Sequence, residues 1–361
     1  MQKWPFKIEY LNQQGHGVTK IADQLAIIPK TLVDEEGTAK VLRENKKTKF
    51  LEIDEIKNQS DRRIKPQCQY YSNCHGCQLQ HMNYADEIEF KKKQFTHSLN
   101  SLFQNYEIKI IKSDKHRYNY RNRVQLHYDL NCKKIGFQNP FTGLITPISN
   151  CILANENIQA AIDKFMAHDI WHELVPPTEP KKGHIEFYDI GQKVHQTWNQ
   201  PHGSKGFTQV NTLLNEQVKK ILAQTHKESK FGNTLELFAG NGNLTNHLKL
   251  TKRVCVDFYN EAQGSFINLN LYDKNALDRF KFSHSSKYKT LILDPPRKGF
   301  NQLAQWAQEL EPKQIIYMSC NYHSALKDIE NLNGYQLKEV YLIDFFPNTH
   351  HFEALIILQR A

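Results

Sequence analysis

The strongest constraint on the fold is the alternation of strand-like and helix-like segments in residues 205–361. Four apolar runs there end in a polar residue or in a turn containing glycine or proline: TLELFAG, RVCVDF, TLILDPP and QIIYMSC. The segment 207–225, which precedes them, has the apolar spacing of an amphipathic helix. This alternation predicts a mostly parallel, doubly wound sheet with helices on both faces, ending in an antiparallel pair, KEVYLIDFF and FEALIILQR. We therefore expect ligands to bind at the carboxyl ends of the parallel strands.

The residues before 205 predict two further domains. Residues 1–57 hold short alternating runs between turn sequences, which predict a small antiparallel barrel: KIEYL, TAKVLREN and KFLEIDEI. Residues 58–204 combine a cysteine-rich stretch, a helical pattern over 85–103 and four β-like runs: RVQLHYDL, IGFQNP, LITPI and IEFYDIG. The expected organisation is a barrel at 1–57, a central β-rich domain at 58–204 and an α/β domain at 205–361.

Composition indicates a globular protein, and its positive charge fits either a polyanionic partner or simply a basic surface. The net charge is +9, and no apolar stretch is long enough to span a membrane. The first residues lack the apolar core of a secretory signal, so we expect a cytoplasmic protein with no membrane contact and no evident obligate protein partner. The run KHRYNYRNRVQLHY alternates cations with aromatic rings, as RNA-binding surfaces do, although a solvated strand face is the alternative.

Three cysteines in the pattern C-x5-C-x2-C form the strongest local signal. Seven cysteines in a reducing compartment favour metal binding or catalysis over disulfides. Thiolates as close in sequence as those of Cys68, Cys74 and Cys77 are expected to share a soft metal. Spacing alone leaves zinc and a 4Fe–4S cluster equally open, and His75 and His81 keep a Cys3His zinc site open as well.

A fourth thiolate has to come from another part of the chain. The candidates are Cys132, Cys151 and Cys255. Cys255 lies inside an expected sheet strand and Cys132 in a turn beside two lysines, so Cys151 is the best candidate.

A glycine loop follows the first strand of the α/β domain. The sequence Gly-Asn-Gly-Asn at 240–243 leads into a helical segment, so its backbone amides can approach a ligand closely. Asp257 ends the next strand, where an acidic side chain typically binds a ribose diol. The loop departs from G-x-G-x-x-G, which favours S-adenosylmethionine over a dinucleotide, while a plain turn is the alternative reading.

The other strand ends carry three reactive side chains. Asp294 follows the third strand and precedes two prolines, so its carboxylate stands on a rigid segment that can accept hydrogen bonds from a cofactor or a nucleobase. Cys320 ends the fourth strand, where a thiolate can attack an electron-poor carbon. Glu353 opens the last strand and can accept a proton. Read singly, each has a structural alternative: a turn aspartate, a core cysteine and a solvated strand end.

Together these segments resemble the RNA uracil-5 methyltransferase family, specifically its 23S rRNA branch, which carries an N-terminal TRAM domain and an iron–sulfur cluster. The resemblance covers nearly the whole chain. Its most specific parts are LDPPRKG, SCN (319–321), NTHHFE (348–353), FTQVN (207–211) and the cysteine triplet.

The resemblance implies a Rossmann-like class I S-adenosylmethionine methyltransferase domain, an OB-like TRAM barrel containing GHGVTKI, and a central iron–sulfur and RNA-binding domain. It implies that Cys320 is the nucleophile, which adds to C6 of uracil, and that Glu353 is the base, which removes the C5 proton. The cofactor contacts that it implies are Gln209, Phe238, Asn243, Asp257, Asn270 and Asp294. The implied cluster ligands are Cys68, Cys74, Cys77 and Cys151, which favours 4Fe–4S over zinc.

Three positions depart from the family pattern. Only 13 positions separate Asp257 from Asn270, where the family usually has a full helix and turn, and this implies a reshaped adenine pocket. Tyr322 replaces the proline after SCN, and Ala239 replaces the cysteine of the glycine loop. Neither replacement removes a reacting group.

Four other functions compete with the 23S rRNA reading. A tRNA uracil-5 methyltransferase is the rival within the class, although that branch typically lacks the cluster and the barrel. The short segment after Asp257 motivates a non-catalytic RNA-binding paralogue with a degenerate cofactor pocket. A radical enzyme would need a C-x3-C-x2-C triplet, which the chain does not have, and a zinc-stabilised domain is the simplest alternative for the cysteines.

Overall fold

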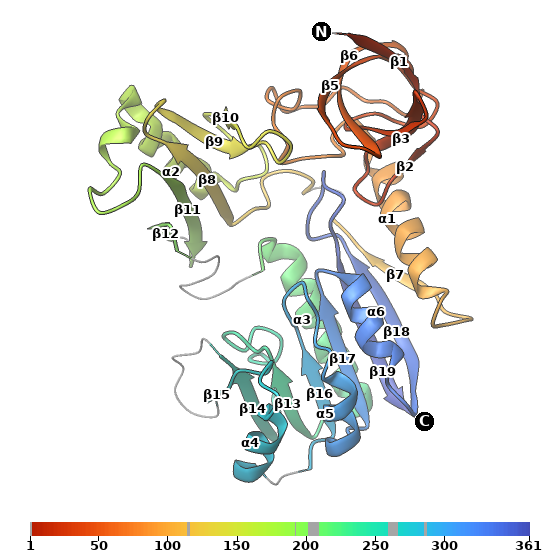
Figure 1. Ribbon diagram of the computed structural model, residues 1–361. Coiled ribbons are helices and arrows are strands. Elements are labelled where there is room, and N and C mark those ends of the chain that lie inside the picture. Colours follow the sequence, from red (N-terminus) through yellow and green to blue (C-terminus); the bar gives the residue numbers. More distant parts are fainter. Residues whose placement is uncertain (1, 114–115, 192, 201–208, 259–265, 285–286) are drawn as a thin grey trace. The chain divides into compact units, whose positions relative to one another are not determined.

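The computed structural model describes residues 2–113, 116–191, 193–200, 209–258, 266–284 and 287–361 (Figure 1). The chain divides into two compact units, each built from several stretches. Unit 1 comprises Met1–Lys91, Asp114–His202 and Phe346–His350, and unit 2 comprises Lys92–Ser113, Gly203–Phe345 and His351–Ala361. The units therefore do not follow chain order, whereas the domain boundaries expected at 57 and 204 remain predictions.

None of the helices in the described ranges has the length and apolarity needed to cross a membrane.

The first sheet of unit 1 has six strands and curls around an apolar interior (Figure 1). In chain order the strands are β1 (Lys3–Lys7), β2 (Tyr10–Leu11), β3 (Gly17–Ile21), β4 (Gln24–Ile28), β5 (Glu36–Glu44) and β6 (Thr48–Asn58), and in space the order is β1-β5-β6-β4-β3-β2. The run KIEYL, predicted as one strand, contributes to both β1 and β2. The break falls at buried Ile8, whose N–H donates to the carbonyl of Glu35 at 2.9 Å.

The second sheet of unit 1 contains the four β-like runs of the central segment. Its strands are β8 (Arg123–Asp129), β9 (Lys134–Gln138), β10 (Ile145–Pro147), β11 (Lys182–Ile190) and β12 (Lys193–Trp198), in the order β10-β9-β8-β11-β12. The helix α2 (Glu156–Met166) packs on it through Ile158, Ile162 and Phe165. Two short 3-10 turns follow α2, η1 (Ala167–Asp169) and η2 (Trp171–Glu173), and the second buries Trp171 in the same core.

The helix α1 (Tyr84–Leu99) matches the helical pattern predicted over 85–103 but ends earlier. Asn83 caps its start, because its side-chain oxygen accepts from N of Asp86 at 2.8 Å. The last predicted turn is instead a tighter loop in which N of Leu102 donates to the carbonyl of Leu99.

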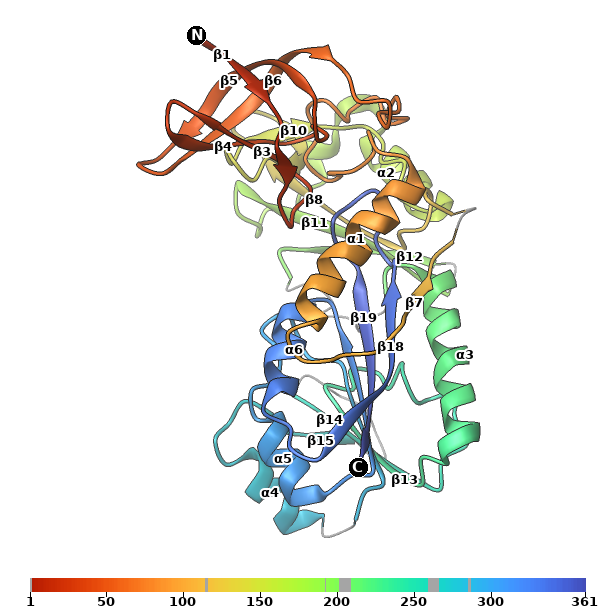
Figure 2. The same cartoon turned by 90° about the vertical axis from the view of Figure 1, so that its right-hand side faces the viewer.

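Unit 2 is a mixed α/β fold around one eight-stranded sheet. Its strands are β7 (Ile108–Ile111), β13 (Asn233–Leu237), β14 (Lys252–Asp257), β15 (Phe266–Asn268), β16 (Thr290–Leu293), β17 (Gln314–Ser319), β18 (Tyr335–Ile343) and β19 (Glu353–Arg360), in the order β15-β14-β13-β16-β17-β19-β18-β7. Figure 2 shows α3 (Thr212–Ser229) on one face and α4 (Ala276–Ser283), α5 (Leu303–Leu310) and α6 (Tyr322–Glu330) on the other. The expected doubly wound arrangement is therefore confirmed.

Strand direction in this sheet sets the position of the candidate site. Strands β15, β14, β13, β16 and β17 run parallel, whereas β19 is antiparallel to both β17 and β18. The predicted antiparallel pair is thus present, and it lies beside the parallel strands in one sheet. The amino end of β19 consequently meets the carboxyl ends of the parallel strands at one edge.

Candidate active site

Cys320 and Glu353 come together at that edge because of the β17–β19 register. Ser319 pairs with Ala354 in the antiparallel ladder, so the next residues outward on the two strands are Cys320 and Glu353. Cys320 is partly exposed, whereas Glu353 is buried. The cysteine therefore lies at the rim of the sheet, beside a carboxyl group, and not among packed hydrocarbon side chains.

The electrostatics of Cys320 favour a neutral thiol in the free protein. Desolvation raises the pKa of Cys320 to about 12, and the negative charges of Glu353 and Asp294 act in the same direction. Arg297 opposes them and lowers the pKa of the thiol. Formation of a thiolate here therefore depends on a change in these surroundings when a substrate binds.

Glu353 has the properties of a proton acceptor. Burial raises the pKa of Glu353 well above its usual value, with a further contribution from Asp294 and an opposing one from Arg297. Among the described residues, its Oε2 has no hydrogen-bond partner. This oxygen is available to accept a proton from a bound reactant.

Asp294 is the second buried carboxyl group of the site. Desolvation, followed by the charges of Glu236 and Asp257, raises the pKa of Asp294 to about 7. Nε2 of Gln209 donates to its Oδ2 at 3.3 Å, so two predicted cofactor residues contact each other directly. Asp294 can thus accept hydrogen bonds from a ligand while Gln209 orients it.

Arg297 is the residue of this site that sequence reasoning passed over. Its backbone carbonyl accepts hydrogen bonds from the side chains of Asn321 and Ser324, both at 2.8 Å. These contacts hold the segment after the two prolines against the start of α6, near Cys320. Arg297 was visible in the sequence as the cation of LDPPRKG. Its neighbours Cys320 and Glu353, however, lie at the ends of two other strands, so its role could not be seen there.

The glycine loop and Asp257 are joined by hydrogen bonds. N of Gly240 donates to Oδ2 of Asp257 at 2.8 Å, and N of Phe258 donates to the other oxygen at 2.6 Å. Gly240 has φ +51° and open space where a Cβ would lie. Phe238, just before the loop, also has a positive φ of 55°, which is rare for an aromatic residue and is typical of functional turns. The loop therefore offers a backbone surface that a small ligand can approach closely.

Asn243 and Asn270, two other predicted cofactor residues, are both held by hydrogen bonds. The amides of Asn243 and Asn215 exchange two hydrogen bonds of 2.9 Å, which fixes the loop to α3. Asn270 follows β15, and its Oδ1 accepts from N of Tyr272 at 3.1 Å. The ring of Phe238 packs on Phe300 and Tyr272. Donors, an acidic residue and aromatic rings at one sheet edge fit the adenosine and amino-acid parts of S-adenosylmethionine.

The four cysteines predicted as metal ligands all belong to unit 1. Each of Cys68, Cys74 and Cys77 has its pKa raised first by burial, and the charge of Cys151 raises it further. In the described ranges no group of three or more His, Cys, Asp or Glu side chains is arranged to hold a metal ion.

Three of the other candidates for that site have defined surroundings in the fold. Cys132 is exposed in a turn and Cys255 is buried in β14. Both ring nitrogens of His81 are engaged, Nδ1 with the hydroxyl of Tyr71 at 2.6 Å and Nε2 with the carbonyl of Thr31 at 3.3 Å. His81 is therefore a structural histidine.

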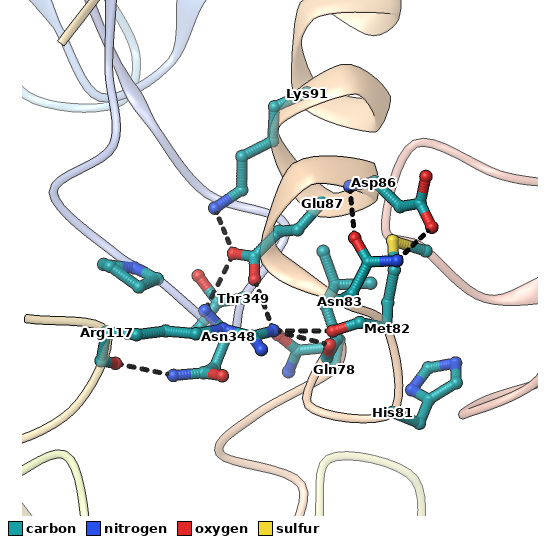
Figure 3. Close-up of polar contacts among 12 residues, drawn as sticks. Gln78, His81, Met82, Asn83, Asp86, Glu87, Lys91, Arg117, Asn348 and Thr349 are labelled. Atoms are coloured by element: carbon teal, nitrogen blue, oxygen red, sulfur yellow. Dashed lines mark hydrogen bonds and ion pairs between the residues drawn. The ribbon is translucent and has the colours of Figure 1, made fainter. Parts of the chain in front are cut away.

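Several cations of the predicted RNA-binding run are internal. Arg123 is buried and donates to Glu186 at 2.8 Å, and Arg117 donates to buried Glu87 at 2.8 Å. Tyr120 is buried as well, and Lys115 lies outside the described residues. Lys91, in the helix predicted over 85–103, is fully buried as well. Buried acidic partners neutralise these side chains inside unit 1, as Figure 3 shows for Glu87, so they do not form a basic surface.

Comparisons with known proteins agree with this site. A family model described as tRNA (Uracil-5-)-methyltransferase matches residues 270–361, which include Asp294, Cys320 and Glu353. The 23S rRNA (uracil(1939)-C(5))-methyltransferase RlmD of Acinetobacter baylyi is 26% identical over 99% of this chain and 96% of its own length. RlmD of Haemophilus parainfluenzae is 27% identical over 99% of this chain and 96% of its own length.

A solved structure has a similar fold over the whole chain. The tRNA (uracil-54, C5)-methyltransferase of Pyrococcus abyssi, in complex with S-adenosyl-L-homocysteine, superimposes with a TM-score of 0.71. It is 20% identical, and the match covers 98% of this chain and 99% of that one. The alignment with Acinetobacter RlmD runs over 454 positions for a chain of 361 residues, so the relative contains segments that this chain lacks.

Proposed function

Because this chain belongs to the RNA uracil-5 methyltransferase family, we propose that it methylates C5 of a specific uridine in 23S rRNA. The observation that carries the proposal is the pairing of Cys320 with Glu353 across β17 and β19. A nucleophile and a proton acceptor on adjacent strands, beside a cofactor-sized loop, meet the needs of this reaction.

The chemistry of uracil explains why both groups are needed. C5 is a poor nucleophile, so the sulfur of Cys320 loses its proton and adds to C6, and the C5=C6 electron pair moves onto the C5–C4–O4 enolate. S-adenosylmethionine, when bound, supplies an electrophilic methyl group, which C5 attacks. Glu353 then removes the proton from C5, the C5=C6 bond reforms, and the Cys320 sulfur leaves C6. The products are the methylated uridine, S-adenosylhomocysteine and a proton.

The side chains around this pair have defined tasks in the proposal. Asp294 and Gln209 orient the cofactor or the base, and Arg297 lowers the pKa of both Cys320 and Glu353. A paired or stacked uridine cannot reach the sulfur, so the nucleotide must be flipped out, at a cost of a few kcal/mol. Expulsion of water from the closed site strengthens each of these electrostatic contacts.

Two different likenesses support candidates for the RNA substrate. The RlmD relatives match this chain over nearly their full length, which favours 23S rRNA. The Pyrococcus structure matches equally completely and supports tRNA as the second candidate. The six-stranded sheet at β1–β6 is the region that we assign to a TRAM-like, RNA-binding barrel.

A direct test compares the two RNAs as substrates. Purified protein with methyl-labelled S-adenosylmethionine is expected to label 23S rRNA, taken from cells that lack this gene, at least tenfold faster than tRNA from the same cells. Nuclease digestion should identify 5-methyluridine as the labelled nucleoside. Faster labelling of tRNA would transfer the assignment to the tRNA branch, and labelling of neither would remove the activity.

We also propose that Cys68, Cys74, Cys77 and Cys151 hold a 4Fe–4S cluster. Four soft donors from two segments of unit 1 support this, because their thiolates repel one another unless a cation is shared. Iron, when bound, supplies that positive charge and deprotonates the thiols. The four cysteines would then tie the loop at 68–77 to the segment before α2.

The cluster has a spectroscopic signature that zinc lacks. Protein purified without oxygen is expected to show the broad visible absorption of thiolate-to-iron charge transfer, and Cys74→Ser should lose it along with bound iron. Cys132→Ser, which changes the exposed cysteine in a turn, serves as the control and should keep the colour. A colourless protein that contains stoichiometric zinc would replace the cluster with a zinc site.

A further inference from the structure

Three polar side chains line the side of α6 that faces the loop after β16. Asn321 is the residue before the helix, and Ser324 and Asp328 follow at spacings of three and four residues, which are those of neighbours on one helix face. Nδ2 of Asn321 donates to Oγ of Ser324 at 2.7 Å. Asp328 is buried although it carries a carboxyl group. We call these three residues the polar face of α6, and all of them belong to unit 2.

The polar face of α6 holds the backbone at both ends of the segment 297–300. The side chains of Asn321 and Ser324 donate to the carbonyl of its first residue, Arg297, both at 2.8 Å. The N–H of its last residue donates to Oδ2 of Asp328. Three side chains of one helix therefore fix the path of a loop that follows a different strand.

Asp328 also connects this segment to the strand that leads to Cys320. Its Oδ2 accepts a hydrogen bond from the hydroxyl of Tyr317 at 2.7 Å, and Tyr317 is a fully buried residue of β17. The segment approaches the helix closely, because Gly299 has φ +77° and a Cβ there would lie 2.5 Å from the same oxygen. One buried carboxyl group thus joins the loop, the helix and the strand.

The end of the segment at Arg297 depends most on these contacts. At the other end, the hydroxyl of Tyr272 donates to the carbonyl of Gly299 at 2.8 Å, and Phe300 is buried in the core. The side chain of Arg297 is exposed, so its direction depends on the backbone that carries it. Loss of the polar face should therefore free the Arg297 end first.

The position of Arg297 matters for the ionisation of Cys320. Burial, Glu353 and Asp294 raise the pKa of this thiol, whereas Arg297 lowers it through its charge and through hydrogen bonding. Because the attraction between opposite charges weakens with distance, a displaced Arg297 would leave the thiol more fully protonated. The polar face of α6 can act on the sulfur in this way without touching it.

We infer that Ser324 and Asp328 are positioning residues for Cys320, because they fix the segment 297–300 on α6 and so keep the Arg297 guanidinium beside the sulfur. The inference rests on the proposed function, in which this sulfur becomes a thiolate before it adds to C6. Ionisation of the thiol can be measured on the free protein, without RNA or cofactor.

Alkylation of Cys320 by iodoacetamide tests the inference, because only the thiolate reacts and a higher pKa slows the reaction at a given pH. Peptide mass spectrometry over a range of pH follows this cysteine separately from the others. Asp328→Ala is expected to slow alkylation roughly tenfold, the effect of moving an opposite charge away from the thiol. Ser324→Ala should slow it roughly threefold, since Asn321 still donates to Arg297. Exposed Cys132, measured in the same samples, should react at an unchanged rate.

Three comparisons separate positioning from a direct charge effect and from a general loss of structure. Removal of the Asp328 charge alone would lower the pKa of the thiol and speed alkylation, so the expected slowing has the opposite sign. Asp328→Asn keeps an acceptor oxygen and should retain the wild-type pH profile. In an Arg297→Met background, Asp328→Ala should change the rate by less than about twofold, because the cation that it positions is already gone. Glu330→Ala removes an exposed carboxyl group from the same helix and is the matched control.

Unchanged or faster alkylation in either folded variant, Asp328→Ala or Ser324→Ala, would overturn the positioning role. Equal slowing by Asp328→Ala with and without Arg297 would overturn it too. Circular dichroism checks the fold, and if Asp328→Ala does not fold, Ser324→Ala decides by the same comparison, because it removes only a hydroxyl. Slower alkylation in the variants, together with no methylation of either RNA by the wild type, would overturn the proposed function and leave the positioning of Arg297 in place.

Discussion

Cys320→Ala is expected to lower the rate of methyl transfer to RNA by at least ~10⁴-fold, the range seen when a covalent nucleophile is deleted. The reason is that no other described side chain combines a nucleophilic sulfur with a place beside Glu353 at this sheet edge. Without addition at C6, C5 of uracil has no enolate character and does not attack the methyl group. Binding of S-adenosylmethionine should be retained, because its expected contacts lie before α3 and at the carboxyl ends of β13, β14, β15 and β16, and do not include Cys320.

Trapping with 5-fluorouridine makes this prediction specific. Fluorine at C5 cannot be removed as a proton is, so the methylated ring stays bonded to the sulfur. Wild-type protein and such RNA should give a complex that survives denaturing electrophoresis, and Cys320→Ala should give none. Cys132→Ala, at an exposed position, is the control and should form the complex at the normal rate. A complex in both, or in neither, would show that Cys320 is not the nucleophile.

Much of the α/β fold could be predicted because local sequence determines it. Strands β13, β14, β16 and β17 are continuous apolar runs that end in turns, and a buried parallel strand requires such a run. The register that sets Cys320 beside Glu353 could not be predicted in the same way. It depends on β19 lying antiparallel between β17 and β18, which no residue near Cys320 encodes.

Buried ion pairs explain where the sequence-based prediction of a basic surface was wrong. Arg123 and Lys91 appear as free cations in a basic chain, yet Glu186 and Glu87 neutralise them inside unit 1. Local composition cannot reveal the partner of Arg123, because its pairing with Glu186 depends on the alignment of β8 with β11. Glu87 and Lys91 lie one helical turn apart, so their pairing is local and only their complete burial was not evident from the sequence. Nor can local composition reveal the role of Arg297, whose charge lowers the pKa of Cys320, a residue that follows a different strand.

Substitution of the base should affect the second half of the reaction. Glu353→Gln is expected to slow turnover by about 10²–10⁴-fold, the usual contribution of a positioned base. Thiol addition and methyl transfer precede proton removal, so the methylated adduct should accumulate on unmodified RNA and remain stable in denaturant. Normal turnover in this variant would show that another group removes the proton.

The pH dependence of adduct release gives an independent test of the same step. Burial raises the pKa of Glu353, and only its ionised form accepts a proton, so release in the wild type should become faster as the pH rises through that pKa. Glutamine does not ionise, so slow release from Glu353→Gln should lose this rise. Arg297→Met removes the charge that lowers the pKa of Glu353, and it should shift the wild-type rise to higher pH. A shift to lower pH would mean that Arg297 does not act on this carboxyl group.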